Sequence, residues 1–585
     1  SQYPQKIVLG DTDKDSNPRA SLVVWEDWTG GIGQYATDGR EGLDQSAFSL
    51  SETRFKGHLT LPKIQVEAAT APDTGAIYDL TELAGRLYGT LNNGTDIYEW
   101  RADLDSWSGK LHSLPATKSS TDALSFRLAG TLYMAFAYLD GYAYSSDGSN
   151  WVNDSTSSTK YLAFWDDRLW GISNGGQLWF STAIGTEVND ALLALPWGGA
   201  VKALFTGPDA AGENILYAAT SVGLYAHDAA NARFVETAVR FPANAGSSGG
   251  AAAGEGAATW NADIYISPGK SAVYRYDPRA GVIGLVGLDR GQGLPSTFAD
   301  EISRLIPVQT GLLAVLVGSG TDSVWEYNGK GWHLVFLSDG SLAGAHVTNL
   351  SDQQFRIYLS EGTGDVGLLN YRELDFGFVN PDVATIVYEG TNDVATHFTP
   401  WFNAGQNDVD KTAIRGRIDC TGMSANETVK IEFGLDYSSS FEASSITVIA
   451  DGVTTFTFPT IANNSVEAGS AFRAIRFKLT LNRGGTTTNT PNVKSLSLEW
   501  RRKIPAKYGF SFDVDRTEDY GGRTPQEMKA DLITAVESST LVEFTFVTDT
   551  GNTQNYYVDV TQMEDIQDTG QNGEKGATRI TVIET

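Results

Sequence analysis

A weak repeat constrains this chain more than any other feature of its sequence. Between residues 66 and 395, pairs of apolar or aromatic residues recur on both sides of turns rich in Gly, Asn, Ser and Asp. The units recur roughly every 40–50 residues, which is the spacing of four-stranded β-propeller blades. A single twisted sheet cannot bury both faces, whereas radial stacking buries them and hides most edges. The paired segments are Leu87-Tyr88 with Ile97-Tyr98, Leu132-Tyr133 with Tyr142-Ala143-Tyr144, Leu169-Trp170 with Leu178-Trp179, Leu216-Tyr217 with Leu224-Tyr225, Ile264-Tyr265 with Val273-Tyr274, Leu312-Leu313 with Val324-Trp325, and Ile357-Tyr358 with Leu368-Leu369.

These units predict a mainly β fold, with a β-propeller of about seven blades over residues 66–395. Six or eight blades stay open, as does a run of unrelated hairpins divided among several sandwiches. The segment Ser145–Trp151 resembles the Asp box of sialidase-like propellers, shortened by one residue. That resemblance implies a structural role, in which Ser145 and Asp147 tie a hairpin turn and Trp151 packs between strands.

The regions that flank the repeat predict three further parts. Residues 1–65 form an N-terminal arm, in which Trp25 and Trp28 precede flexible glycines. We interpret both tryptophans as anchors that pack the arm onto a neighbouring surface, rather than as a ligand platform. Residues 396–503 predict an antiparallel β-sandwich. The strict alternation of its segment 475–481 places four side chains on one face: Ile475, Phe477, Leu479 and Leu481.

Residues 504–585 hold the one clear helix and predict a small α+β module. Thr524 to Glu527 form a capping box, with proline at the first helical position. Strands are expected at 542–546, 556–560 and 580–582, and a turn at 549–552 joins the first two. The helix carries an apolar stripe made of Met528, Leu532, Ala535 and Val536.

Charge and cysteine content exclude several classes of protein. The chain has 43 Lys and Arg against 71 Asp and Glu, a formal net charge of −28. Because that charge repels polyanions and anionic lipid, we expect no nucleic-acid partner and no docking on anionic lipid. Because no stretch of about 18 unbroken apolar residues occurs, we expect no membrane insertion. The single cysteine, Cys420, excludes an intrachain disulfide framework and a multi-cysteine zinc site. Its strand-like surroundings predict a buried, inert thiol.

Patterns typical of catalysis or metal binding are few, so we expect no enzyme activity, cofactor or metal. The six histidines are scattered, and the motifs of serine hydrolases, P-loop proteins and zinc proteases do not occur. Asp11, Asp13 and Asp15 resemble the start of a calcium loop. However, Ser16 stands where glycine is required and Leu22 where the bidentate glutamate should be. Whether calcium binds there stays open.

Cations gather in the predicted sandwich of an otherwise acidic chain. By the alternation above, Arg476 and Lys478 share the solvent face. They fit either ordinary outward positions of a sheet or a dock for an acidic surface of another copy or subunit. In the second case, replacing Arg501 and Arg502 by glutamate should abolish assembly and leave the monomer folded. The candidate docking residues are Arg473, Arg476, Lys478, Arg501, Arg502 and Lys503, with Arg483 in the same run of cations.

Both ends of the chain resemble structural proteins of tailed-bacteriophage tails. The segments 25–31 and 57–62 are similar to the tryptophan-glycine arm that precedes a propeller of loosely repeated Tyr/Trp hairpins in such proteins. The module from Tyr508 through the capped helix to Ile580 is similar to a small domain of phage tail proteins. The resemblance implies an oligomeric virion component of the tail, assembled in the host cytoplasm. Its partners would be other tail proteins or a host surface receptor.

Two classes of function follow from these observations. The first is a structural tail protein, whose loops contact neighbouring subunits or a host receptor. The second is a carbohydrate-binding or glycan-cleaving propeller, whose Trp and Tyr residues stack on sugars. A structural subunit should purify as a defined oligomer or with particles and show no glycan turnover. We favour the structural protein by analogy with the tail-protein family.

Overall fold

The computed structural model describes most of the chain, and within that part the chain is mainly β. It divides into two compact units, one of residues 22–407 and 414–498, the other of residues 1–21, 408–413 and 499–585. The described residues are 5–7, 21–32, 44–62, 65–74, 77–91, 94–101, 104, 106–115, 118–192, 199–241, 252–269, 272–288, 294, 298, 301–318, 321–338, 340–349, 355–363, 366–373, 394–459, 469–486, 488–502, 507–538, 540–547, 551, 553–569 and 575–584.

Short sheets of mostly antiparallel, consecutive strands make up residues 80–373 of the first unit, and a single parallel contact between Leu192 and Arg233 joins two of them into one eight-stranded sheet. The strands are β7 (Leu80–Leu83), β8 (Arg86–Leu91), β9 (Asp96–Arg101), β10 (Ser106–Trp107), β11 (His112–Ser113), β12 (Ser120–Leu128), β13 (Thr131–Tyr138), β14 (Gly141–Ser145), β15 (Val152–Asp154), β16 (Tyr161–Trp165), β17 (Arg168–Ile172), β18 (Gln177–Ser181), β19 (Glu187–Leu192), β20 (Val201–Pro208), β21 (Asn214–Thr220), β22 (Gly223–Asp228), β23 (Arg233–Arg240), β24 (Ala257–Trp260), β25 (Asp263–Ile266), β26 (Val273–Asp277), β27 (Val282–Gly287), β28 (Glu301–Pro307), β29 (Leu312–Val317), β30 (Ser323–Tyr327), β31 (Trp332–Leu337), β32 (Ser341–Asn349), β33 (Phe355–Thr363) and β34 (Val366–Glu373).

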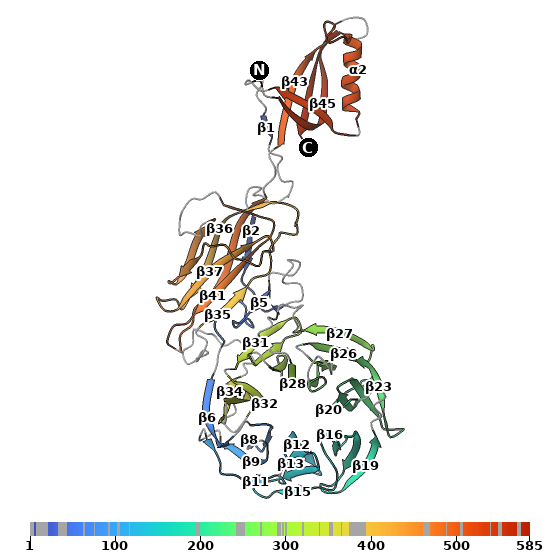
Figure 1. The fold of residues 1–585 in the computed structure, drawn as a ribbon, viewed down its shortest axis with the longest axis vertical. Coiled ribbons are helices and arrows are strands. Elements are labelled where there is room, and N and C mark those ends of the chain that lie inside the picture. The colour runs from blue at the N-terminus through green and yellow to red at the C-terminus, as the bar shows by residue number, and fades with distance from the viewer. Residues whose placement is uncertain are drawn as a thin grey trace. The chain divides into compact units, whose positions relative to one another are not determined.

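These sheets are arranged in a ring, the arrangement of a β-propeller (Figure 1). The strands β12, β16, β20, β28 and β32 lie toward the centre of the ring, and β15, β19, β23 and β27 lie at its rim. Hydrophobic clusters fill the spaces between neighbouring sheets, such as the one in which Phe126 of β12 packs with Leu162 of β16 and Trp179 of β18. The core is therefore divided among the interfaces between sheets, as radial stacking requires.

The paired segments of the sequence repeat lie in the two middle strands of each successive group of strands in the ring. Leu132-Tyr133 belongs to β13 and Tyr142-Ala143-Tyr144 to β14, and the other pairs follow the same rule. These middle strands are the most deeply buried because they have a sheet neighbour on each side and a packed sheet on each face. The prediction that the repeat marks paired strands is confirmed.

A strand that precedes the ring in the sequence completes its last sheet. Strand β6 (Gln65–Thr74) pairs antiparallel with β34, with Thr74 opposite Val366 and Ala69 opposite Leu369. This pairing joins the start of residues 66–395 to their end. Closure of this kind ties the two ends of the ring together by backbone hydrogen bonds, which favours a stable ring.

Two further sheets in the chain contain most of residues 394–502. One has the strand order β2-β42-β36-β39, with β40 also paired to β36, and the other has the order β38-β37-β41-β35-β5. In β41 the predicted alternation is confirmed, since Ile475, Phe477, Leu479 and Leu481 are buried and the residues between them are partly exposed. The strands are β2 (Ser21–Trp25), β5 (Phe48–Ser49), β35 (Val394–Phe398), β36 (Lys411–Thr421), β37 (Thr428–Leu435), β38 (Ile446–Val448), β39 (Gly452–Thr457), β40 (Ser470–Phe472), β41 (Ile475–Asn482) and β42 (Asn492–Arg502).

The N-terminal 65 residues, predicted as an arm, form no sheet of their own among the described residues. Besides β2 and β5, they supply β3 (Gly31–Ile32), which pairs with β31, and β4 (Gln45–Ser46), which pairs with β3. Strand β1 (Gln5–Ile7) belongs to the second compact unit, where it pairs with β43 (Lys507–Asp515). The arm therefore completes sheets made by distant parts of the sequence.

The second compact unit contains the predicted α+β module. Its sheet has the order β1-β43-β46-β45-β44, where β44 is Val542–Val547, β45 is Thr553–Thr569 and β46 is Lys575–Glu584. Helix α2 (Pro525–Val536) begins with the predicted capping box at Thr524 and Glu527, and with the predicted proline. The expected apolar stripe is only partly buried, and Val536 is 37% exposed. Among the described residues, no helix has the length and apolar character needed to cross a bilayer.

Candidate functional site: the N-terminal arm and the cationic strand

Two tryptophans of the arm are completely buried. Trp25 meets the rings of Phe402 and Phe477 edge-on, with ring centroids 5.9 and 5.6 Å away. Trp28 meets the imidazole of His397 edge-on at 5.9 Å. All of these partners belong to the two sheets beyond the ring or to the loop after β35. Neither tryptophan offers a face to a ligand, and both hold the arm in a packed core.

Strand β3 continues the arm along the rim of one ring sheet. Ile32 pairs with Trp332 of β31, and the side-chain amide of Asn328 donates to the carbonyl of Thr29 at 2.7 Å. The approach is so close that a Cβ added to Gly31, which has φ +61°, would meet the Trp332 carbonyl oxygen at 2.6 Å. Glycine at this position therefore permits the strand to pair with the ring.

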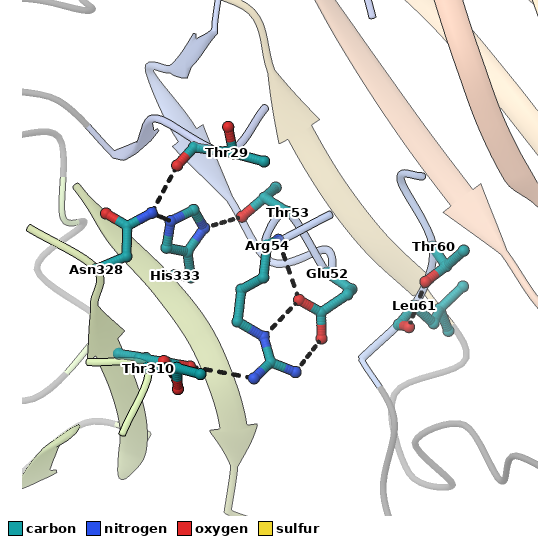
Figure 2. Close-up of polar contacts among 10 residues, drawn as sticks. Thr29, Glu52, Thr53, Arg54, Thr60, Leu61, Thr310, Asn328 and His333 are labelled. Carbon is teal, nitrogen blue, oxygen red and sulfur yellow. Dashed lines mark hydrogen bonds and ion pairs between the residues drawn. The ribbon is translucent and has the colours of Figure 1, made fainter. Parts of the chain in front are cut away.

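A buried cluster of charges follows in the arm (Figure 2). Arg54 donates two hydrogen bonds to Glu52, of 2.8 and 2.9 Å, and a third of 3.1 Å to Glu326 of β30. The side chains of Arg54, Glu52 and Glu326 are 9%, 3% and 3% exposed. Burial disfavours the charged guanidinium, but the two carboxylates outweigh that effect and raise the pKa of Arg54. Thr310 completes the cluster by donating to Glu326 at 2.7 Å.

His333 forms a second buried polar contact between the arm and β31 (Figure 2). Its Nδ1 lies 2.7 Å from the hydroxyl of Thr53, and its Nε2 lies 2.9 Å from the side-chain nitrogen of Asn328. Burial lowers the pKa of His333 to about 4, although Glu326 and Glu52 act in the opposite direction. The ring is therefore neutral at pH 7 and serves as a hydrogen-bonding bridge.

The arm then returns to the sheets beyond the ring. The backbones of Leu59 and Val493 exchange two hydrogen bonds, of 3.1 and 3.0 Å, and the Leu61 amide donates to Thr490 at 3.1 Å. Phe48 packs between Phe298 and Phe398, with ring centroids 5.7 and 6.2 Å away. Residues 22–62 thus form backbone, apolar and charged contacts with segments hundreds of positions away. This arrangement joins two parts of the unit by many buried contacts.

The two predicted docking cations of β41, Lys478 and Arg476, differ from each other in their surroundings. Lys478 donates to Glu432 of β37 at 2.9 Å, and Lys430 reaches the same carboxylate at 3.0 Å. Burial alone would raise the pKa of Glu432, but hydrogen bonds from both lysines outweigh it and lower the pKa. The charge of Lys478 is therefore balanced within the chain.

Arg476 lies instead against aromatic rings. Its guanidinium carbon is 4.5 Å from the ring centroid of Trp401, 5.0 Å from that of Phe441 and 5.7 Å from that of Phe398. Burial lowers the pKa of this arginine below its usual value. The sequence pattern placed Arg476 on the outer face, but it contained no signal for the aromatic surroundings.

The remaining candidate docking residues are scattered. Arg473 and Arg501 are exposed, Arg502 is partly exposed, and Lys503 lies outside the described residues. Arg501 and Arg502 belong to the second compact unit, whereas Arg473, Arg476 and Lys478 belong to the first. Arg483, which belongs to the same run of cations in the sequence, follows the last residue of β41 and is only 1% exposed.

Sequence reasoning missed a polar cluster on the strands at the centre of the ring. Arg304 of β28 donates to Asp79, which precedes β7, at 2.6 Å. Asp122 of β12 accepts a hydrogen bond of 2.8 Å from the Leu162 amide of β16. Burial raises the pKa of Asp122 to about 7 despite that hydrogen bond. These residues lie far apart in the sequence, and they come together only when the strands are arranged around one centre.

Two local predictions concern side chains that the structure describes. In the segment 145–151, the Asp147 carboxylate accepts from the amides of Ser149 and Asn150 at 2.8 and 2.7 Å, and the Trp151 indole donates to Gly148 at 3.1 Å. The structural role of this turn is confirmed. Cys420 is fully buried, and burial raises its pKa to about 12, as expected for an inert thiol.

Among the described residues, no group of three His, Cys, Asp or Glu side chains is placed to hold a metal ion. The possible calcium loop at Asp11, Asp13 and Asp15 lies outside the described residues. The prediction about calcium therefore stays open.

No protein-family model and no curated protein matches this chain. Solved structures with partial similarity include YCF48 bound to D1 peptide, with 14% identity, a TM-score of 0.38, and coverage of 54% of this chain and 100% of that one. BBS1N in complex with ARL6DN has 13% identity, a TM-score of 0.37, and coverage of 53% and 96%. The extracellular domain of a putative hybrid two component system from B. thetaiotaomicron has 10% identity, a TM-score of 0.38, and coverage of 71% and 58%.

Proposed function

We propose that this chain is a structural component of a bacteriophage virion tail, and that it acts through protein contacts in tail assembly or host attachment. The proposal starts from the similarity of the arm and the C-terminal module to phage tail proteins. It assigns the chain to the virion, with other tail proteins, further copies of itself or a host receptor as partners. In this proposal the chain catalyses no reaction.

The observation that carries the proposal is the construction of the arm. Arg54 binds Glu326 across 272 positions of sequence, and Thr53 binds His333 across 280. Buried charges and a buried histidine are costly unless they are paired, and here all of them serve to fix one part of the chain on another. Such a rigid connection suits a protein that transmits contacts between neighbouring subunits.

The proposal includes a finer description of the fold. The first strands of the ring sheets contact one another in the cyclic order β7, β12, β16, β20, β24, β28, β32 and back to β7. We therefore assign seven blades, with β6 as the outer strand of the last one. The two sheets beyond the ring form a β-sandwich, since Phe456 of β39 and Phe477 of β41 pack against each other with ring centroids 6.4 Å apart.

Localisation in particles tests this function. Antibodies against the chain should label the tails of purified phage particles whose genome encodes it, in negative-stain electron microscopy. The chain should also stay with the particles through density-gradient purification. Loss of the chain from purified particles would refute the proposal.

A carbohydrate-binding or glycan-cleaving propeller is the alternative, and the polar cluster at the ring centre favours it. Asp122, Asp79 and Arg304 present partly exposed or buried polar groups from different sheets of the ring near one centre. Under this alternative, the purified chain binds or cleaves an oligosaccharide, and Asp122→Asn or Arg304→Met removes that activity. Under the structural proposal, both variants leave tail incorporation unchanged.

A further inference from the structure

Arg476 is a partly buried cation that has no acidic partner among the residues that the structure describes. Three aromatic rings surround its guanidinium, and its Nε atom is enclosed without a hydrogen-bond acceptor. Its hydrogen bond is from Nη2 to the Ser438 carbonyl, at 3.3 Å. In the part of the chain that the structure describes, no carboxylate forms an ion pair with it. Buried or half-buried arginines are normally paired, so this arrangement calls for an external anion.

The strand beside Arg476 explains how the guanidinium is held. Gly434 of β37 is its register partner, and a Cβ there would meet Ser440, Arg476 and Trp401 atoms at 3.4–3.6 Å. The glycine thus leaves room for the guanidinium to lie between β37 and the aromatic rings. Because the hydrogen bond to Ser438 is solvent-exposed, the outer edge of the guanidinium reaches the surface.

The neighbouring cation on the same strand, Lys478, differs from Arg476 in its pairing. Lys478 lies two positions along the same strand and already has Glu432 as its partner. An incoming carboxylate would therefore gain more from Arg476 than from Lys478. Arginine also suits this role because its planar guanidinium can bind a carboxylate through two parallel hydrogen bonds.

We propose that Arg476 anchors a self-association surface, and that its missing partner is a carboxylate of a second copy of this chain. The argument is charge complementarity: the chain carries 71 acidic against 43 basic residues, so a second copy presents a largely acidic surface to this cation. The aromatic rings lower the cost of binding because they have already removed part of the water from the guanidinium. The inference deepens the proposed structural function and rests on it.

Sedimentation velocity of the full chain over a range of concentrations tests the inference. The natural chain should self-associate, and Arg476→Met should weaken association at least about tenfold while leaving the monomer folded. Arg476→Lys keeps the charge but loses the bidentate geometry, so we expect an intermediate affinity. Arg168→Met is the matched control, because Arg168 also lies over an aromatic ring, Phe180 at 4.8 Å, in the ring sheets. A natural chain that stays monomeric, or unchanged association of Arg476→Met, would overturn the inference.

Carbodiimide cross-linking identifies the partner directly. In a mixture of nitrogen-14 and nitrogen-15 chains, Lys478 should couple to Glu432 within one chain, which is an internal control, and to an acidic residue of the other chain. If no cross-link between isotopically different chains involves residues 473–478, the self-association surface does not include Arg476 and the inference is wrong. If antibodies label the phage tails but Arg476→Met associates as the natural chain does, the proposed function stands. Only this inference is then rejected.

Discussion

Arg54 and Arg476 belong to the same compact unit and are both shielded from water, but their surroundings differ. Arg54 has two buried carboxylates within 3.1 Å, and these raise its pKa. Arg476 has three aromatic rings, and burial lowers its pKa. The first arrangement is complete within one chain, whereas the second has no counter-charge in the described part of the chain. The comparison teaches that burial alone does not make an arginine structural; its partners decide whether it serves the fold or an interface.

The largest expected effect is on stability, through Arg54→Met. This change leaves Glu52 and Glu326 buried without their cation, so the unit that contains the ring should lose about 3–5 kcal/mol of unfolding free energy. Urea unfolding followed by tryptophan fluorescence measures the loss. Adding Glu326→Gln to Arg54→Met removes one of the two uncompensated charges. The double variant should therefore recover part of the lost unfolding free energy. A loss below about 1 kcal/mol would contradict the role assigned to this cluster.

The pH dependence of stability tests the neighbouring histidine. The folded-state pKa of His333 is about 4, below the ordinary value of 6.5, so the unfolded chain binds the proton more readily. The contribution of neutral His333 is therefore fully present above pH 6.5 and is lost as the pH falls toward 4, by an amount on the order of 3 kcal/mol.

Urea midpoints measured between pH 7 and pH 4 give this dependence. Burial also lowers the pKa of His346 to about 4 and that of His397 to about 3, so His333→Gln should flatten the pH dependence only in part. An unchanged slope in His333→Gln would show that His333 does not contribute.

The strands that are buried on both faces could be predicted from the sequence. Most of the contacts that join these strands to the rest of the chain could not. Pairs such as Leu216-Tyr217 in β21 and Leu224-Tyr225 in β22 stand out because middle strands need apolar side chains in consecutive positions. The first strands, such as β28, mix polar residues such as Ser303 and Arg304 with apolar ones and therefore gave no signal. The alternation of β41 placed Arg476 on the outer face, but it carried no information about the aromatic rings around its guanidinium.

The partners of Arg54 could not have been found from the sequence. Glu52 lies two positions away, but nothing in that spacing distinguishes it from an ordinary surface pair. Glu326 is 272 positions away and meets Arg54 only because β3 pairs with β31. Contacts of this kind depend on the closed ring and on the path of the arm, which a local pattern does not contain.

A smaller loss is expected where the arm passes the rim of the ring. A Cβ at Gly331 would collide with the backbone carbonyl of Gly30, which belongs to the turn before β3. Gly331→Ala should therefore separate β3 from β31 and cost about 1–3 kcal/mol, less than removing the cation of the buried cluster. Gly485→Ala is the control, because a Cβ there meets no atom within 4 Å. Equal stability of the two variants would contradict the close approach of arm and ring.

The smallest effect on stability should come from Arg476→Met, which completes the comparison of the two arginines. The methionine keeps apolar contact with Trp401 and Phe441, and it leaves no carboxylate without a partner because Arg476 has none among the described residues. Loss of the cation–π contacts and relief from burying a charge act in opposite directions, so the unfolding free energy should change by less than about 1 kcal/mol. Urea unfolding at a protein concentration low enough to keep the chain monomeric measures it. A loss comparable to that of Arg54→Met would mean that Arg476 is bound to the fold as tightly as Arg54, and the difference drawn between the two arginines would disappear.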